Sequence, residues 1–172
     1  MDNYLKLNDN KVYILFHKPR NIIGSLISLW TLGKYSHCEF LINGKVYLAD
    51  VLKGVTEVDY KEKSNVDFYE LHEHIEMNDI LDFFHYNKGK KYDMDGIIGS
   101  QFLWFLNSHN EDKFFCSEFC LNAIDYALQF TLTYKLKSLE HKGYNKFSPN
   151  RLFKYLKEME LIKERTRVIT IG

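Results

Sequence analysis

Cysteine and histidine are the residue types in this chain whose placement could support nucleophilic catalysis. Cys116 stands immediately before residues 117–130, whose apolar spacing predicts a helix. The N–H groups and the dipole at a helix N-terminus favour an anion, so a thiol there is biased toward the thiolate. The thiolate is the nucleophilic form, and a neighbouring imidazole would activate it further. The competing interpretation is a buried structural cysteine, since free cysteines are among the most buried residues.

His37 differs from the other histidines because a predicted β-hairpin gives it acidic neighbours. Asn43-Gly44 lies between the apolar runs His37–Ile42 and Lys45–Asp50. It indicates a type I′ turn, in which both central residues need positive φ. Counting outward from a two-residue turn gives four cross-strand pairs: Ile42 with Lys45, Leu41 with Val46, Glu39 with Leu48, and His37 with Asp50.

Two carboxylates compete for the role of orienting the His37 ring. Asp50 is the cross-strand partner, at a Cβ separation of about 4.5–5.5 Å. Glu39 lies two residues along the same strand and therefore on the same face, and a one-residue slip would leave Glu39 there alone. Either carboxylate would fix the imidazole tautomer and stabilise the imidazolium. Without a catalytic role, the same pair would be a salt bridge at a strand end.

A zinc site is the rival use of the same residue types. Cys116 and Cys120 are spaced i, i+4, share a helix face, and would bind the ion together with His37 or Cys38. The spacing matches no standard zinc motif, and Cys120 falls on the apolar stripe of its helix. We therefore expect no bound metal, no cofactor, and free thiols at all three cysteines.

The elements that must position these residues form a mixed order of strands and helices. Besides the hairpin, strands are expected over 12–16, 54–58, Val66–Leu71 and 168–171, and helices over 19–32, 78–88, 117–130 and 149–159. The last helix has Ser148 as its cap, followed by proline at the first helical position. The expected apolar stripe of helix 117–130 is Phe119, Cys120, Ala123, Ala127 and Phe130. This order favours an α+β fold in a single domain over residues 1–172.

Composition narrows the range of functions. The chain has 172 residues, of which 45% are hydrophobic, enough for a globular core. Its 23 basic and 23 acidic residues cancel, which does not favour a nucleic-acid partner. The N-terminal residues show no secretory signal, and the longest apolar run, 96–106, falls short of the roughly 20 residues of a spanning helix. We expect a soluble cytoplasmic protein or, if a virus encodes it, one of the host-cell cytoplasm or the virion.

Four short segments, taken in order, resemble a known family. YSHCEFLINGKVYLAD (35–50) with KGV (53–55) is similar to the Ser-His hairpin of the circularly permuted papain-fold amidohydrolases. These are the NlpC-like permuted proteins of the YiiX and YebB kind, related to lecithin:retinol acyltransferase. KYDMDGIIG (91–99) is similar to their Tyr-Asp segment, FFCSEF (114–119) to their Cys-Ser-Glu motif, and FSPNRLFKYL (147–156) to their Ser-Pro-x-x-Leu segment. The resemblance covers roughly residues 35–156, with histidine before cysteine as in the family.

The resemblance implies a permuted papain-like fold, in which a central antiparallel sheet packs against the helix that begins at the nucleophile. It implies Cys116 as the nucleophile and His37 as the general base. Asp50 would be the third polar group, whereas relatives with His-x-Glu and no acid on the next strand point to Glu39. The backbone N–H of Cys116 would bind the oxyanion. The further oxyanion and cleft residues would be Tyr92 and Ser117.

The sequence is compatible with two functions. The first is a cysteine-dependent amide or ester hydrolase or acyltransferase, which acts through a thioester on a cell-wall type peptide or a lipid acyl group. FLWFL (102–106) would then line an acyl site or make a peripheral membrane contact, unless it is buried core. The second is a catalytically silent binding or structural module on the same fold, as in many phage and viral chains. The presence of all three polar positions favours the enzyme.

Overall fold

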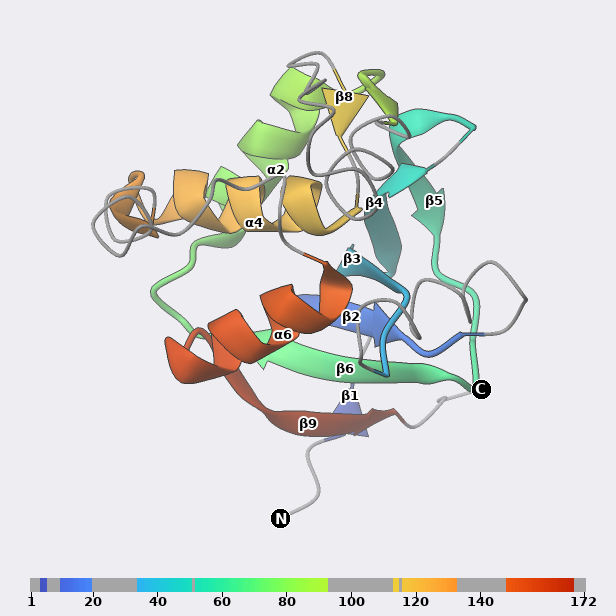
Figure 1. Cartoon of the computed structure of the whole chain (residues 1–172), viewed down its shortest axis with the longest axis vertical. Coiled ribbons are helices and arrows are strands. Elements are labelled where there is room, and N and C mark those ends of the chain that lie inside the picture. Colours follow the sequence, from blue (N-terminus) through green and yellow to red (C-terminus); the bar gives the residue numbers. More distant parts are fainter. Residues whose placement is uncertain are drawn as a thin grey trace, which may run out of the picture. The chain divides into compact units, whose positions relative to one another are not determined.

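The computed structural model describes residues 4–5, 10–19, 34–50, 52–92, 113–114, 116–132 and 148–168. Strands and helices are mixed along these residues, which confirms the α+β class (Figure 1). The chain divides into two units. The first comprises Met1–Tyr47, Glu57–Glu73 and Ser148–Gly172, and the second comprises Leu48–Thr56 and His74–Phe147. The expectation of a single domain stays a prediction.

Most of a sheet whose neighbouring strands are mainly antiparallel belongs to the first unit, whereas its residues 48–50 and 54–56 belong to the second. The strand order is β1 (Tyr4–Leu5), β9 (Ile162–Val168), β6 (Val66–Leu71), β2 (Val12–His17), β3 (His37–Ile42), β4 (Lys45–Asp50) and β5 (Gly54–Asp59). β1 pairs with β9 in parallel, and the pairs from β9 through β6, β2 and β3 to β4 are antiparallel. Every residue of β2 and β6 is buried, and in β6 the buried residues include Asp67 and Glu70.

Helix α6 (Pro149–Glu158) packs on this sheet within the first unit (Figure 1). The Ser148 side chain accepts a hydrogen bond from the N–H of Arg151 at 3.2 Å, which confirms the predicted cap. The ring of Phe153 lies 5.4 Å from that of Phe16 on β2 and 5.1 Å from that of Tyr69 on β6. The helix therefore covers the two central strands through an aromatic contact.

The β3–β4 hairpin forms as predicted at Asn43-Gly44. Both residues have positive φ, 47° and 77° respectively, as a type I′ turn requires. The structure confirms the pairs nearest the turn: Ile42 with Lys45, and Leu41 with Val46, followed by Phe40 with Tyr47. The two outer pairs, Glu39 with Leu48 and His37 with Asp50, would join the two units and stay predictions.

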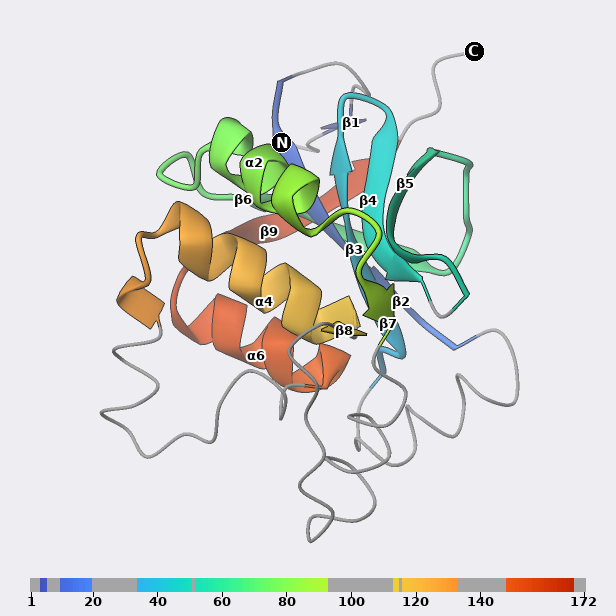
Figure 2. The same cartoon turned by 90° about the horizontal axis from the view of Figure 1, so that it is seen from above.

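The second unit contains two packed helices, α2 (Met77–Asn87) and α4 (Cys116–Ala127) (Figure 2). The ring of Phe83 on α2 lies 5.9 Å from those of Phe119 and Tyr126 on α4. Two short strands, β7 (Lys91–Tyr92) and β8 (Lys113–Phe114), pair in parallel ahead of α4. The packed helix and the strand pair together fix where α4 begins.

Gly54 allows the start of β5 to lie directly against the segment that follows α2. The N–H of Val55 donates to the carbonyl oxygen of Lys90 at 2.7 Å, and the N–H of Gly89 donates to that of Val55 at 2.9 Å. Gly54 has φ +73°, and a Cβ added there would lie 2.1 Å from the Lys90 oxygen. Only glycine fits both this conformation and this close approach.

The structure corrects two sequence predictions. The strand β9, Ile162–Val168, overlaps the strand expected over 168–171 only at residue 168; residues 162–167 were not predicted as strand, and residues 169–171 lie outside the described residues. Phe130 is not part of the buried stripe, because α4 ends at Ala127 and Phe130 is 61% exposed with φ +61°. Strands β1, β7 and β8 were not predicted. The helix expected over 19–32, apart from residue 19, and the apolar run 96–106 lie outside the described residues, as does residue 115.

The remaining helices and strands begin and end within one to three residues of their predicted bounds. The predicted stripe of α4 is buried at Phe119, Cys120, Ala123 and Ala127. Among the residues that the structure describes, no helix has both the length and the apolar character needed to cross a membrane.

Candidate functional site

A buried carboxylate, that of Glu39 on β3, lies between two histidine rings. Its Oε2 is 3.3 Å from Nε2 of His37, and its Oε1 is 2.7 Å from Nε2 of His17. Nζ of Lys63 lies 3.1 Å from the same Oε1. The β2–β3 register sets this arrangement, since it places His17 directly opposite His37, with ring centroids 5.3 Å apart. These four residues, all in the first unit, are named the histidine–glutamate cluster.

The partners of Glu39 keep its carboxylate ionised. Burial alone would raise the pKa of Glu39, but hydrogen bonds from His17 and His37 outweigh burial and hold that pKa well below its usual value. The pKa of His17 is lowered, because burial disfavours the imidazolium more than Glu39 favours it. A neutral His17 that donates its Nε2–H to the carboxylate satisfies both groups. The side chain of His37 is more exposed than that of His17, 29% against 10%.

His17 and Lys63 are the members of this cluster that sequence reasoning missed, and His17 is the one that contacts the carboxylate most closely. The strand was expected over 12–16 and stopped one residue short of it. Residues 18–36 connect β2 to β3, so no tight turn fixes the register between these strands. The only signal was a histidine directly after an apolar run, and that signal does not reveal which strand lies beside it.

Cys116 is the first residue of α4, as the sequence predicts, and it is 4% exposed. Two positions earlier, Phe114 of β8 pairs with Tyr92 of β7. The backbone of Tyr92 therefore lies beside the segment that leads into Cys116, within the second unit. Ser117 is completely buried. A thiol at the first residue of a helix lies at the positive end of the helix dipole.

Cys38 and Cys120 are both completely buried, and none of the three cysteines forms a disulfide. Cys120 lies on the buried stripe of α4, as predicted. Across the described part of the chain, no group of three or more His, Cys, Asp and Glu side chains is arranged to hold a metal ion. The zinc hypothesis therefore finds no site within those residues.

Asp50 ends β4 and organises the turn that follows it. Its Oδ1 accepts hydrogen bonds from the N–H groups of Leu52 at 2.8 Å and Lys53 at 2.9 Å. This is the local side-chain to backbone bonding typical of aspartate in turns. Asp50 thus has a structural role within the second unit.

The structure brings His37 and Glu39 together in the first unit, and the Tyr92 backbone beside the approach to Cys116 in the second. The pairing of His37 with Cys116 or with Asp50 joins the two units and stays a prediction. No family model, curated protein or solved structure matches this chain. The chemistry of the site therefore rests on the contacts described above.

Proposed function

We propose that this chain is a cysteine-dependent hydrolase or acyltransferase with Cys116 as the nucleophile and His37 as the general base. The observation that carries the proposal is the buried Glu39 carboxylate in contact with Nε2 of His37. Burying a charge is costly, and a hydrophobic pair would serve folding at least as well. A carboxylate in this relation to an imidazole is what orients the base in triad enzymes. The position of Cys116 at the first residue of α4 supports the nucleophile.

The proposed reaction follows from the ring nitrogen that Glu39 contacts. If Nε2–H of His37 donates to Glu39, the basic lone pair is on Nδ1. Nδ1 takes the thiol proton of Cys116, and the thiolate attacks the carbonyl carbon of an amide or ester. The bond to the leaving group breaks, the leaving group receives the proton from His37, and the acyl group stays on Cys116 as a thioester. Water or another nucleophile then releases it, with His37 taking its proton.

We assign the orienting role to Glu39 rather than to Asp50. Glu39 contacts the ring directly, and His17 and Lys63 hold its carboxylate in place. One oxygen of Asp50 instead accepts two backbone hydrogen bonds in its own turn. The oxyanion donors in this proposal are the N–H of Cys116 and the hydroxyl of Tyr92. The substrates are cell-wall type peptides or lipid acyl groups, as the sequence resemblance implies.

The fold that we infer for this function is the permuted papain-like, NlpC-like arrangement. Three observations support it: an antiparallel sheet, a histidine on β3 ahead of the cysteine in chain order, and a cysteine at the start of α4. The assignment to the permuted papain-like fold requires that the thiol of Cys116 lie beside the ring of His37.

A silent binding or structural module is the second candidate function. The low exposure of Cys116, 4%, favours it, because an inert structural cysteine is equally buried. The two candidates differ in whether Cys116 can carry an acyl group.

Acylation by two activated esters, p-nitrophenyl acetate and p-nitrophenyl octanoate, tests the proposal. We expect a single acyl adduct on Cys116 by peptide mass spectrometry, and its loss in Cys116→Ala. His37→Asn should slow its formation, whereas Cys120→Ala, the matched cysteine variant, should leave it intact. An adduct that still forms in Cys116→Ala would overturn the proposed enzymatic activity and favour the binding module. So would the absence of any adduct with either ester.

A further inference from the structure

A second buried carboxylate, that of Asp67 on β6, forms ion pairs with three cationic side chains. Its side chain has no exposed surface. Nζ of Lys18 and Nη2 of Arg165 lie 3.0 Å and 2.7 Å from Oδ1, and Nζ of Lys34 lies 3.3 Å from Oδ2. The hydroxyl of Tyr35 donates to the same Oδ2 at 2.8 Å. Lys18, Lys34, Arg165 and Asp67 are named the Asp67 cluster.

The Asp67 cluster carries more positive charge than Asp67 can balance. Burial alone would raise the pKa of Asp67, but hydrogen bonds from Lys18, Tyr35 and Lys34 bring it below its usual value, so the carboxyl stays ionised. Among the described residues, one negative charge at this cluster then faces three positive ones. The three cationic side chains are 41%, 54% and 58% exposed, so their excess charge is open to solvent. Each ammonium has three N–H donors and a guanidinium has five, so a cation that binds Asp67 has donors for a second acceptor.

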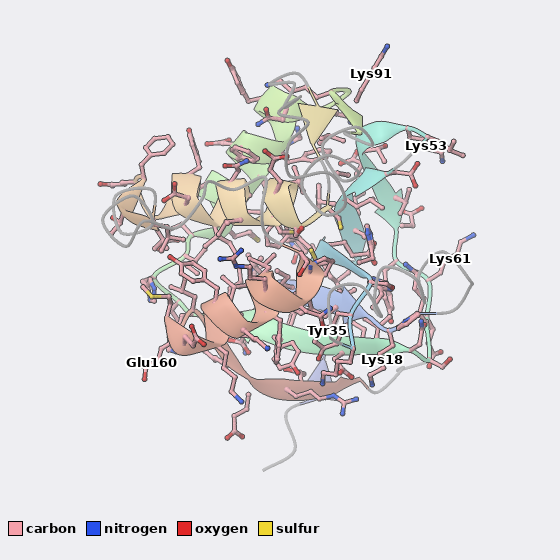
Figure 3. The ribbon with its side chains drawn as sticks, viewed as in Figure 1. Lys18, Tyr35, Lys53, Lys61, Lys91 and Glu160 are labelled. Atoms are coloured by element: carbon pink, nitrogen blue, oxygen red, sulfur yellow. The ribbon has the colours of Figure 1, made fainter. Side chains whose placement is uncertain are left out.

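A groove of about 660 Å³ adjoins this cluster within the first unit. Tyr69, Phe153 and Ile162 supply its apolar surface, and Lys157 and Lys163 also line it. Arg165 is the member of the Asp67 cluster that lines the groove as well as binding Asp67. Lys34 also connects the Asp67 cluster to the groove, because its Nζ lies 5.6 Å from the ring centroid of Phe153. Lys18 and Tyr35 lie near one end of α6 and Glu160, which also lines the groove, near the other (Figure 3).

We propose that this groove is a binding site for a small organic phosphate. The phosphate group contacts Lys18, Lys34 and Arg165, and a planar apolar body lies against the rings of Tyr69 and Phe153. A phosphate monoester carries a charge of about −1.5 to −2 at neutral pH, which matches the excess on the cluster better than a single carboxylate does. A groove of this size holds one small ligand. Glu160 and Glu164 line the groove too, beside Lys157 and Lys163, so charges of both signs occur along its wall.

Titration calorimetry of the full chain with phenyl phosphate tests the proposal, with inorganic phosphate, phenol and octyl phosphate as comparison ligands. We expect phenyl phosphate to bind more tightly than inorganic phosphate or phenol, because it uses both the cluster and the rings. Lys34→Gln and Arg165→Gln should each weaken it about tenfold, the effect of losing one charge-assisted hydrogen bond. Lys45→Gln removes the same charge from β4, where Lys45 pairs with Glu57 at 3.7 Å, and should leave binding unchanged.

Phe153→Leu tests the aromatic part of the site separately from the cationic part. It should weaken the binding of phenyl phosphate and leave the binding of inorganic phosphate unchanged. Lys34→Gln leaves Asp67 with Lys18, Arg165 and Tyr35, so it tests the charge even if Arg165→Gln does not fold. Equal losses in Lys45→Gln and Lys34→Gln would reduce the binding to general electrostatics and overturn the site. If octyl phosphate bound more tightly than phenyl phosphate, and Phe153→Leu did not change its affinity, the ligand would be aliphatic and lipid-like. That result would overturn the proposal that the ligand has a planar apolar body. Failure of wild type to bind phenyl phosphate at millimolar concentration would overturn the proposal as a whole.

Discussion

Replacing Glu39 by glutamine removes the charge of the histidine–glutamate cluster while keeping the size of the side chain. The carboxylate, 1% exposed, has three partners within 3.3 Å: His17, His37 and Lys63. Glutamine offers one acceptor oxygen and one amino group, so it cannot accept from both histidines. Hydrogen bonds to a charged group contribute about 1.5–3 kcal/mol each, and neutral ones about 0.5–1.5 kcal/mol. With one bond lost, one weakened and some desolvation cost relieved, the free energy of unfolding should fall by about 2–3 kcal/mol.

The pH dependence of this loss identifies its cause. Because the pKa of Glu39 is lower in the folded than in the unfolded chain, its stabilising contribution is complete above the unfolded value of 4.5. The contribution is lost as the pH falls from 4.5 through the folded pKa. The stability gap between wild type and Glu39→Gln should therefore be full near neutral pH and shrink in acid.

Urea denaturation at a series of pH values measures the gap, with Glu57→Gln as the matched control. Glu57 is a half-buried glutamate on β5 that pairs with Lys45 at 3.7 Å, so its loss should cost about 0.5 kcal/mol or less. Equal losses in Glu39→Gln and Glu57→Gln would show that the buried charge of Glu39 contributes no more than an ordinary partly exposed ion pair. A gap that stays constant as the pH falls below 4.5 would show that the ionisation of Glu39 is not the cause of the loss.

Three further changes have expected outcomes. His17→Asn should lower the free energy of unfolding by about 1–3 kcal/mol in urea denaturation, because it leaves a buried charge with one donor fewer. Gly54→Ala should lower the melting temperature far more than Gly89→Ala. Both glycines have positive φ, but the added Cβ meets the Lys90 oxygen at 2.1 Å only at Gly54, and equal effects would contradict the close approach. Cys120→Ala should cost about 1 kcal/mol of stability without changing the acylation rate, since Cys120 lies in the core.

Local signals predicted much of the fold. The Asn43-Gly44 turn alone specified β3, β4 and their inner register, because few sequences tolerate positive φ at two successive residues. Ser148 and the proline after it specified the start of α6 for a similar reason. The contact of Glu39 with His37 followed from the period of two along β3.

The parts that were missed depend on contacts between distant segments. β9 reads IKERTRV, a charged sequence that resembles no buried strand. It pairs with β6 because Arg165 and Lys163 form ion pairs with Asp67 and Glu70 on that strand. His17 joins Glu39 through a strand pairing that no turn specifies. Phe130 continues the apolar spacing of α4 but lies beyond the last helical residue, since the backbone turns to positive φ at Gln129.

The most direct test of the proposed function is the rate of alkylation of each cysteine by iodoacetamide as a function of pH, read by peptide mass spectrometry. An ordinary thiol gains reactivity around pH 8.5, about the pKa of free cysteine. We predict that Cys116, although it is buried like Cys38 and Cys120, reacts faster than both, with a midpoint well below that pH. We also predict that His37→Asn abolishes the shift and that Glu39→Gln reduces it. Two results would contradict the thiolate–imidazole pair and the proposed enzymatic activity. One is a Cys116 that does not react, and the other is a reaction midpoint that is the same in wild type and in His37→Asn.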